Sequence, residues 1–263
     1  MAQKKAATTK KATSVKTATA SSYAGVRDHV ATSLRTASLW RAIGAEFIGT
    51  FLLASIVIVC QGQPLYVLFG LVGIVLLIGA VSGAHVNPAI TVGAWTTKRI
   101  GWFRALAYII AQVLGAIVAY VTLSAFLAGA DAPSAEAISY GASAPKLFEA
   151  EAISQVAEAG KQWYALFAEV LGTAILGYAV AHATRSKETL VAAFSAGTGI
   201  FIALMVGITV ASYAGATSII NPAVATVLQA FDSSVWSYAV YALAPVIGGI
   251  IGFVLYDTIS GKK

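Results

Sequence analysis

The stretch Ser82–Thr91 reads SGAHVNPAIT, and its triplet Asn87-Pro88-Ala89 occurs a second time as Asn221-Pro222-Ala223. Asn is a preferred N-cap residue and Pro a preferred first residue of a helix, so each triplet predicts the start of a short helix. Both copies lie in apolar sequence, where irregular backbone is tolerated only if it is buried in protein or lines a cavity. Two helices that begin at membrane depth, with free backbone N–H groups in their first turns, therefore indicate a pore between them.

The composition is that of a membrane protein. The chain has 263 residues, of which 58% are hydrophobic and 11% charged, and its mean hydropathy is +0.80. These values exclude a soluble domain of this size. Six segments have the roughly 20 apolar residues that the hydrocarbon core of a bilayer requires. The predicted spans are 42–60, 65–82, 103–128, 163–183, 190–211 and 236–257, and the predicted half-helices are 87–97 and 221–230.

Basic residues mark one face of this arrangement. Lys and Arg precede the first span, follow the first half-helix and the fourth span, and end the chain at Lys262 and Lys263. The connection 129–162 carries acidic residues instead, among them Asp131 and Glu149. Because cytoplasmic loops are enriched in Lys and Arg, the sequence predicts that both termini are cytoplasmic. We expect an integral protein of the plasma membrane, inserted by its first span without a cleaved signal peptide.

Residues 1–40 are expected to form a basic cytoplasmic tail that precedes a channel domain at 41–260. Lys, Ala, Thr and Ser dominate residues 1–21, which predicts disorder. An amphipathic helix on the inner leaflet is then predicted by apolar residues at helical spacing, Tyr23, Val26, Val30 and Leu34. The tail either contacts anionic lipid or only sets solubility and orientation, and the sequence favours neither.

The two halves of the channel domain repeat each other. The first span contains Ala45-Glu46-Phe47-Ile48-Gly49-Thr50 and the fourth contains Ala168-Glu169-Val170-Leu171-Gly172-Thr173, so Ala-Glu-x-x-Gly-Thr occurs twice. The repeats span about 41–128 and about 163–258, joined by the loop 129–162. Each repeat has three spans, so the second must enter the membrane with opposite orientation, and an inverted repeat follows. Its pseudo-two-fold axis brings Asn87 and Asn221 together at the midplane.

Ser82–Thr91, the second triplet, the paired Ala-Glu-x-x-Gly-Thr segments and Ala111-Gln112-Val113-Leu114-Gly115-Ala116 together resemble the aquaporin, or major intrinsic protein, family. The resemblance covers about residues 42–257. It implies an all-α membrane fold, a right-handed bundle of six tilted helices with two re-entrant half-helices, assembled as a homotetramer with one pore in each subunit. It also implies a channel rather than an enzyme, and no nucleophile, base and orienting group occur at credible spacing.

The predicted pore constriction consists of Asn87, Pro88, Ala89, Asn221, Pro222 and Ala223. The two amides would point N–H groups into the lumen, so a passing water molecule turns its oxygen toward them. Both half-helix dipoles raise the energy of a cation or proton at this point. Plain N-capping is the alternative role, and one side chain can do both.

Glu46 and Glu169 lie within spans, where a carboxylate costs about 2.5 to 3.5 kcal/mol on insertion scales and needs a partner or a wet cavity. The resemblance implies that they accept hydrogen bonds from the loops before the half-helices, a structural role that we favour over transport chemistry. His85, in the loop that leads to the pore, is either a gate or pH sensor or a packed, hydrogen-bonded residue, and we favour the latter. Close helix crossing is expected at Gly49, Gly115, Gly172 and Gly248.

Val224 stands where most members of the family have an Arg in an outer selectivity filter. Ungapped distances from the triplets place the other filter positions at Val67, Thr209 and Ser218, whereas a shift of the span-two pattern puts Phe69 in the lumen instead. A ring of Val, Thr, Ser and Val has no cation and no aromatic group, so it should be wider and less polar. We therefore expect passive conduction of water with passage of urea, ammonia, hydrogen peroxide or glycerol.

Two other functions remain open. An apolar filter that dewets would give a small-solute or gas channel with poor water flux. A bundle that serves adhesion or scaffolding would be a non-conducting membrane-organising protein, although the intact pore asparagines argue against it. The single cysteine, Cys60, excludes an intramolecular disulfide, and no metal site and no cofactor is expected. The expected partners are water, small neutral solutes and the lipid bilayer, with no nucleic acid.

Overall fold

The computed structural model describes residues 28, 30–141, 146–158 and 160–261. The described residues fall into two units that divide between Arg41 and Ala42. The disorder predicted for 1–21 and the apolar positions Tyr23 and Val26 lie outside the described residues. In the first unit, the indole Nε1 of Trp40 donates a hydrogen bond to the carbonyl oxygen of Leu34 (2.8 Å).

Six helices within the described ranges are long and apolar enough to cross a membrane. Five are single α-helices: α2 (Ala37–Val59), α3 (Pro64–Ser82), α5 (Trp102–Ala128), α8 (Gln162–Ala183) and α9 (Thr189–Ser212). The sixth consists of α11 (Val235–Tyr238), the π-helical η1 (Ala239–Leu243) and α12 (Ala244–Ile259). The six predicted spans are confirmed to within about two residues at every end but one, since α2 begins at Ala37.

The sixth span widens to π geometry directly before Pro245. Pro has no N–H to donate, and its ring displaces the carbonyl group four residues back, which belongs to Tyr241. A local π turn accommodates such a conflict without ending the helix. It leaves Tyr241 fully buried, with its hydroxyl donating to the carbonyl oxygen of Thr217 (3.2 Å) in the loop before the second triplet.

Two short helices, α4 (Pro88–Thr96) and α10 (Pro222–Val227), begin at the two triplets. The predicted bounds 221–230 for the second were too long, because the helix ends at Val227. Gln229 has a φ of 56°, and the N–H of Ala230 donates back to the carbonyl oxygen of Ala225 (3.1 Å). This is the left-handed motif that commonly ends helices.

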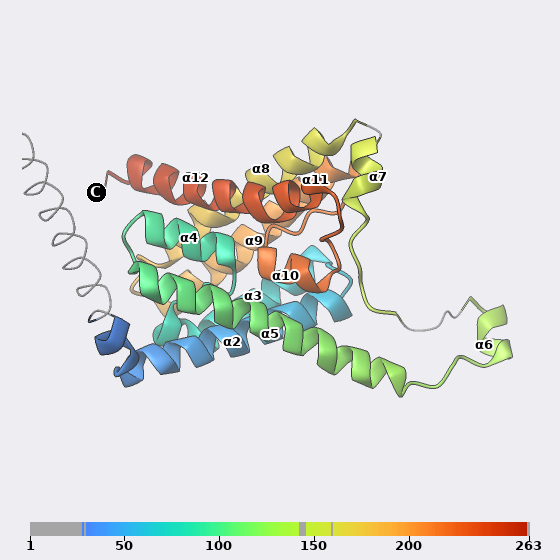
Figure 1. Cartoon of the computed structure of the whole chain (residues 1–263), viewed down its shortest axis with the longest axis horizontal. Helices are drawn as coiled ribbons and strands as arrows, with labels where there is room; N and C mark the ends of the chain where they lie inside the picture. Colours follow the sequence, from blue (N-terminus) through green and yellow to red (C-terminus); the bar gives the residue numbers. More distant parts are fainter. Residues whose placement is uncertain (1–27, 29, 142–145, 159, 262–263) are drawn as a thin grey trace, which may run out of the picture. The chain divides into compact units, whose positions relative to one another are not determined.

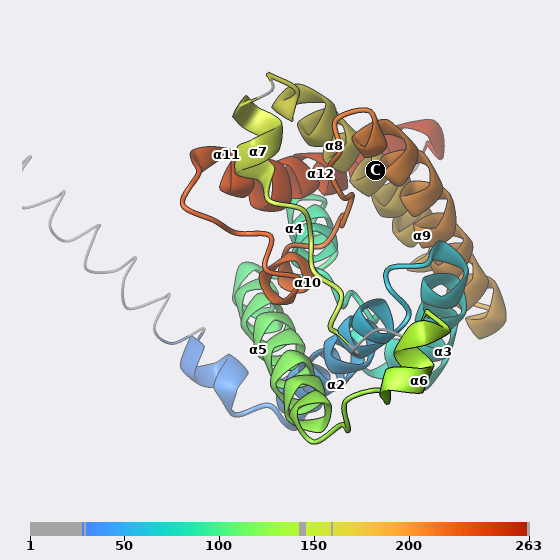
Figure 2. The same ribbon diagram turned by 90° about the vertical axis from the view of Figure 1, so that its right-hand side faces the viewer.

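The spans of the unit 42–263 surround the two half-helices. In the end-on view of Figure 2, α4 and α10 lie inside a ring made by α2, α3, α5, α8, α9 and α12. Helix α8 contacts α12 and α9, α3 contacts α9, α4 contacts α12, and α10 contacts α5. The side view of Figure 1 shows α4 and α10 lying between the long spans. Each re-entrant helix thus packs inside the bundle against a span of the other repeat, α4 against α12 and α10 against α5.

Close contacts at glycines occur in matching places in both repeats. A Cβ on Gly115 would overlap the carbonyl oxygen of Phe47, and one on Gly248 would overlap that of Val170. Close helix crossing is therefore confirmed at Gly115 and Gly248. It is confirmed at Gly172 as well, where a Cβ would lie 3.1 Å from the carbonyl oxygen of Ala203 on α9 and 2.8 Å from Cγ2 of Ile220. A Cβ on Gly49 would instead meet side chains only, Ile78 of α3 and, at 2.6 Å, Val86 of the loop before the first triplet.

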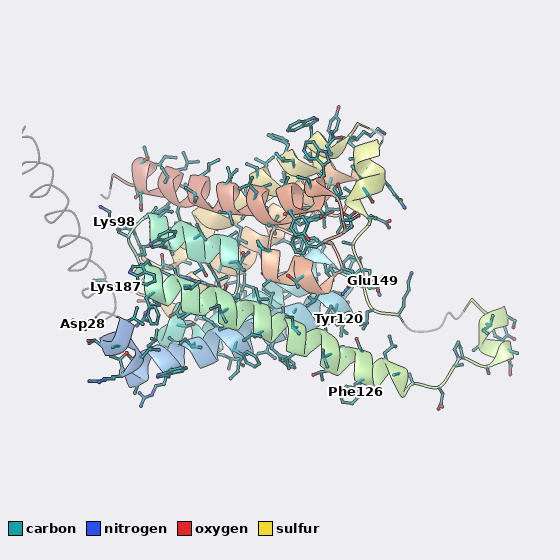
Figure 3. All side chains as sticks on the ribbon, viewed as in Figure 1. Asp28, Lys98, Tyr120, Phe126, Glu149 and Lys187 are labelled. Atoms are coloured by element: carbon teal, nitrogen blue, oxygen red, sulfur yellow. The ribbon has the colours of Figure 1, made fainter. Side chains whose placement is uncertain are left out.

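Exposed charged side chains lie at both ends of the bundle. Lys98 and Lys187 lie at one end and Glu149 at the other (Figure 3). The connection 129–162 contains two helices that the sequence analysis did not predict, α6 (Ala135–Ser139) and α7 (Ile153–Glu158). Ile153 and Val156 of α7 are buried, and α7 contacts α8 and α11. We call the end that carries α7 the outer end and the end that carries Lys98 the inner end.

Candidate pore

The amides of Asn87 and Asn221 cross between the two repeats. Nδ2 of Asn87 donates to the carbonyl oxygen of Ile220 (2.8 Å), and Nδ2 of Asn221 donates to that of Val86 (3.0 Å). Each Oδ1 also caps its own helix, accepting from the N–H of Ala89 (2.8 Å) in one repeat and of Ala223 (3.1 Å) in the other. Because Nδ2 carries two hydrogens, each amide keeps one donor for a molecule that reaches it.

The carboxylates of Glu46 and Glu169 hold the backbone that precedes each triplet. Glu46 accepts from the N–H groups of His85 (2.9 Å) and Val86 (2.8 Å), and Glu169 accepts from those of Ile219 (2.5 Å) and Ile220 (2.8 Å). Val86 and Ile220 have φ values of 42° and 53°, which β-branched residues rarely adopt. Charge-assisted hydrogen bonds of this kind stabilise strained turns. The contacts of Glu46 and Glu169 therefore fit a role in holding the two loops in shape.

Gln112 adds a third donor to Glu46 in the first repeat, a contact that the sequence analysis missed. Its Nε2 donates to Oε2 of Glu46 (2.7 Å) and to Oγ1 of Thr91 (2.9 Å). The signal was present in the Ala-Gln segment of the third span, but its target depends on how two helices cross. The matching residue of the second repeat is Pro245, which has no side-chain donor.

His85 is buried beside this network. Its Nδ1 lies 3.2 Å from Oγ1 of Thr91, and its ring meets that of Tyr108 edge to face, with 5.5 Å between centroids. The hydroxyl of Tyr108 donates in turn to the carbonyl oxygen of Ser82 (2.9 Å). His85 is thus packed and hydrogen-bonded, and it lines a small cavity together with Asn87 and Asn221.

Three cavities follow one another through the unit. The outer cavity has a volume of about 380 Å³, the central one about 10 Å³ and the inner one about 240 Å³. Leu53, Ile200 and Asn221 line both the outer and the central cavity, and Ala84, Val180 and Ala196 line both the central and the inner one. The central cavity has room for about one water molecule. The path therefore narrows to single file where the two asparagines meet.

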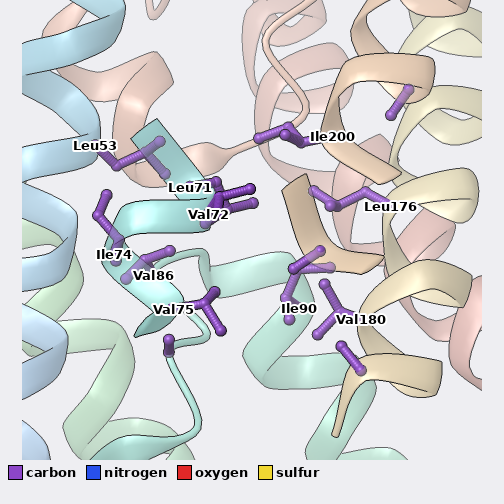
Figure 4. Close-up of a cluster of buried hydrophobic side chains, with 14 of the residues drawn as sticks. Leu53, Leu71, Val72, Ile74, Val75, Val86, Ile90, Leu176, Val180 and Ile200 are labelled. Atoms are coloured by element: carbon purple, nitrogen blue, oxygen red, sulfur yellow. The ribbon is translucent and has the colours of Figure 1, made fainter. Parts of the chain in front are cut away.

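Most of the wall of the central cavity is apolar. The polar side chains that line it are His85, Asn87 and Asn221, and none of its described lining residues carries a fixed charge. Figure 4 shows apolar side chains of the surrounding cluster converging from several helices. Those labelled there that line the central cavity are Leu53, Leu71, Val86, Ile90, Leu176, Val180 and Ile200.

The four predicted filter residues, Val67, Thr209, Ser218 and Val224, all line the outer cavity. Val67 is 1% exposed, whereas Phe69 is 59% exposed on α3 and is not part of the cavity wall. None of the described residues that line this cavity is charged. Phe148 also lines this cavity, from the connection between α6 and α7, and the sequence analysis did not predict it there.

A charge cluster ties three elements together at the inner end. Asp257 of α12 accepts two hydrogen bonds from Arg99, after α4, at 2.8 and 3.0 Å. It accepts a third from Arg185, after α8, at 3.0 Å. The Arg99 guanidinium also lies 4.9 Å from the ring centroid of Phe253. This cluster fixes the inner end of α4 without reaching the cavities.

Six helices able to cross a membrane surround a path whose outer and central cavities have no charged residue among their described lining, and two re-entrant helices meet at its narrowest point; this arrangement defines a membrane channel. The chain belongs to the major intrinsic protein family, since the model of that family, Major intrinsic protein, matches residues 31–256. Members of the family are channels, not enzymes, which confirms that part of the sequence prediction.

Known relatives cover most of the chain. It is 31% identical to lens fiber major intrinsic protein of Homo sapiens over 239 residues, 85% of this chain and 82% of the relative. It is 28% identical to aquaporin Z of Photorhabdus laumondii over 246 residues, 85% of this chain and 99% of the relative. The X-ray structure of the aquaglyceroporin from Plasmodium falciparum shares the fold, with a TM-score of 0.60 and 22% identity over 84% of this chain and 97% of that one.

Proposed function

We propose that this chain is a passive channel for water and small neutral solutes, among them urea, glycerol, ammonia and hydrogen peroxide, and that it excludes protons and ions. The observation that carries the proposal is the series of three cavities joined at the crossed amides of Asn87 and Asn221. The curated relatives named aquaporin support a water path.

The central cavity supplies the barrier to ions and protons. An ion that enters a space for about one water molecule must shed its hydration shell, and an apolar wall offers nothing in return. The free N–H of each asparagine amide and the first turns of α4 and α10 turn the oxygen of a water molecule toward them. A water held in that orientation donates to neighbours on both sides, which interrupts a proton-conducting chain.

The outer cavity sets a weaker restriction. Val67, Thr209, Ser218 and Val224 present hydroxyl groups and apolar surface, with no cationic side chain to narrow the lumen. The hydroxyl of Thr209 donates to the carbonyl oxygen of Met205 (2.7 Å), so it offers a solute only an acceptor. We therefore propose that neutral solutes with several N–H or O–H donors pass this region together with water.

A second candidate is a small-solute or gas channel with poor water flux. The apolar wall of the central cavity favours it, because hydrophobic constrictions can dewet. The two candidates differ in the ratio of water to solute permeability, which a single series of measurements provides.

The proposal is tested by stopped-flow light scattering on proteoliposomes. Shrinkage under an impermeant osmolyte gives the water permeability, and re-swelling under urea or glycerol gives the solute permeability. Wild type should exceed empty liposomes in both, and Val224→Arg should reduce solute flux more than water flux. Val224→Leu controls for bulk without charge, and Thr209→Arg brings a cation to the same cavity from an exposed position. Folded wild-type protein that passes neither water nor solute would refute the channel.

We also propose in which membrane the channel lies, how it is oriented and how its subunits assemble. The inner end carries Lys98, Arg99, Arg104, Arg185 and Lys187, and the enrichment of cytoplasmic loops in basic residues supports cytoplasmic termini in a plasma membrane. Large apolar side chains are exposed along the spans, for example Leu77, Ile110 and Phe167. We propose that these contact lipid and neighbouring subunits of a homotetramer. Chemical cross-linking in vesicles tests the homotetramer. Protease access to the N-terminal tail tests the cytoplasmic position of the termini.

A further inference from the structure

We infer that Phe148 limits the size of the solutes that enter the outer cavity, and so determines specificity from a loop rather than from a span. The inference deepens the proposed function and rests on it. Among the described residues that line the outer cavity, Phe148 is the only aromatic one. The four filter positions of the spans and the second re-entrant loop supply none.

The segment that carries Phe148 is anchored at the outer end. Figure 2 shows the chain that leads into α7 passing beside α10. The N–H of Ala150 donates to the carbonyl oxygen of Leu228 (2.7 Å), and Leu228 is fully buried and lines the same cavity. Leu147, Phe148 and Ala150 are all partly buried against one apolar cluster. These contacts hold the ring at the mouth of the cavity.

The following residues secure the segment further. Ile153 and Val156 are buried in contacts of α7 with α8 and α11. The N–H of Ser154 donates to Oδ2 of Asp232 (3.2 Å), in the loop that follows α10. Both anchors belong to the second repeat, so the ring of Phe148 is positioned by the same half of the molecule as Val224.

The ring reaches across to the first repeat. A Cβ on Gly62, in the loop between α2 and α3, would lie 2.9 Å from Cε1 of Phe148. Gly62 also has a φ of +66°, a conformation that costs glycine nothing. Only a residue without a side chain lets the ring come this close to the opposite wall. Phe148 therefore bridges the mouth between an anchor on the second repeat and a glycine on the first.

The chemistry of the ring decides which solutes it disfavours. A phenyl group takes up space in the mouth and offers no hydrogen bond to a solute that has left part of its water behind. The unreplaced hydrogen bonds are more numerous for a polyol than for urea or hydrogen peroxide. Phe148 should thus discriminate against longer polyols far more than against urea or water.

The test compares permeability ratios in proteoliposomes for wild type, Phe148→Ala, Phe148→Leu and Phe148→Trp, with glycerol and meso-erythritol each measured against urea. Phe148→Ala should raise both ratios by at least about threefold, which is less than the roughly 10- to 200-fold that one methylene is worth in a closed pocket, because the mouth is open. Phe148→Leu should lie between Phe148→Ala and wild type, and Phe148→Trp should lower both ratios. Glu149→Ala, a neighbouring exposed residue outside the cavity wall, should leave them unchanged.

Each outcome supports or overturns the inference that Phe148 limits solute size. Unchanged ratios in folded Phe148→Ala, with wild type conducting urea, overturn the inference and leave the proposed function intact. A rise of the same size in Glu149→Ala overturns it as well, since the effect would then come from loosening the segment. If Phe148→Ala does not fold, the order of Phe148→Leu, wild type and Phe148→Trp decides by the same criterion. A wild type that passes neither water nor urea overturns both the proposed function and this inference.

Discussion

The substitution Gly172→Ala should weaken both the fold and the conduction of the channel. A Cβ on Gly172 would lie 2.8 Å from Cγ2 of Ile220 and 3.1 Å from the carbonyl oxygen of Ala203, whereas ordinary contacts begin at 3.4 Å. Ile220 must therefore shift by several tenths of an ångström. It has little freedom to do so, because its N–H donates to Glu169 and its carbonyl oxygen accepts the amide of Asn87.

The magnitude follows from two opposing effects. Overpacking a buried site costs about 1–3 kcal/mol, and replacing Gly by Ala inside a helix returns about 0.8–1.0 kcal/mol. The free energy of unfolding should thus fall by up to about 2 kcal/mol, which lowers the midpoint temperature by up to a few degrees. A shift of Ile220 also weakens its hydrogen bond with the Asn87 amide, which lines the pore. If this raises the free-energy barrier to water passage by about 1 kcal/mol, water flux falls about fivefold.

The assay measures thermal unfolding in detergent and water permeability in proteoliposomes on the same preparation. Gly73→Ala on α3 is the matched control, because a Cβ there meets nothing within 4 Å. It should leave permeability unchanged and raise the midpoint or leave it unaltered, since only the helix propensity changes. The reasoning is refuted if Gly172→Ala and Gly73→Ala agree in both measurements.

Two further predictions concern carboxylates at opposite ends of the bundle. Asp257→Asn should reduce the free energy of unfolding by about 1–3 kcal/mol, because it weakens charge-assisted hydrogen bonds to Arg99 and Arg185, whose side chains are only 13% and 32% exposed. Partial burial acts to raise the pKa of Asp232, but hydrogen bonds from the N–H of Ser234 and from two other serines outweigh it and hold the pKa below its ordinary value. The stability that Asp232 contributes is therefore present at neutral pH, above the unfolded pKa, and is lost as pH falls through the folded pKa. Asp232→Asn should lower the midpoint temperature at pH 7 and make progressively less difference as the pH is lowered.

Exposed carboxylates serve as controls for the predictions on Asp257 and Asp232. Glu188→Gln at the inner end and Asp131→Asn at the outer end remove a charge at exposed positions, so each should change the midpoint temperature little. The account of Asp257 fails if Asp257→Asn unfolds at the same temperature as Glu188→Gln. The account of Asp232 fails if the deficit of Asp232→Asn relative to wild type grows as the pH falls.

The spans were predictable because the hydrocarbon core of a bilayer demands about 20 apolar residues in a row. The starts of the half-helices were predictable as well, since an N-cap followed by Pro is a local signal. The end of α10 was not, because it depends on the positive φ of Gln229 and the back-bond of Ala230. The helices α6 and α7 and the π turn before Pro245 were also missed. Short helices and local widening follow from tertiary contacts more than from hydrophobic pattern.

The sequence by itself determined the class of the protein. Two Asn-Pro-Ala triplets, two Ala-Glu-x-x-Gly-Thr segments and an odd number of spans in each half are matters of residue identity and counting. They require no knowledge of how the helices touch. They were enough to predict a six-span inverted repeat with two re-entrant helices.

Only the tertiary structure decided which atoms meet. Val67 and Phe69 are two residues apart, a rotation of about 200° around a helix, so the cavity wall and the outer surface of α3 could be told apart only once its orientation was known. The bond from Gln112 to Glu46 and the reach of Phe148 to Gly62 join residues far apart in the chain. Such contacts are set by the rotation and crossing of whole helices, which a linear pattern of side chains does not encode.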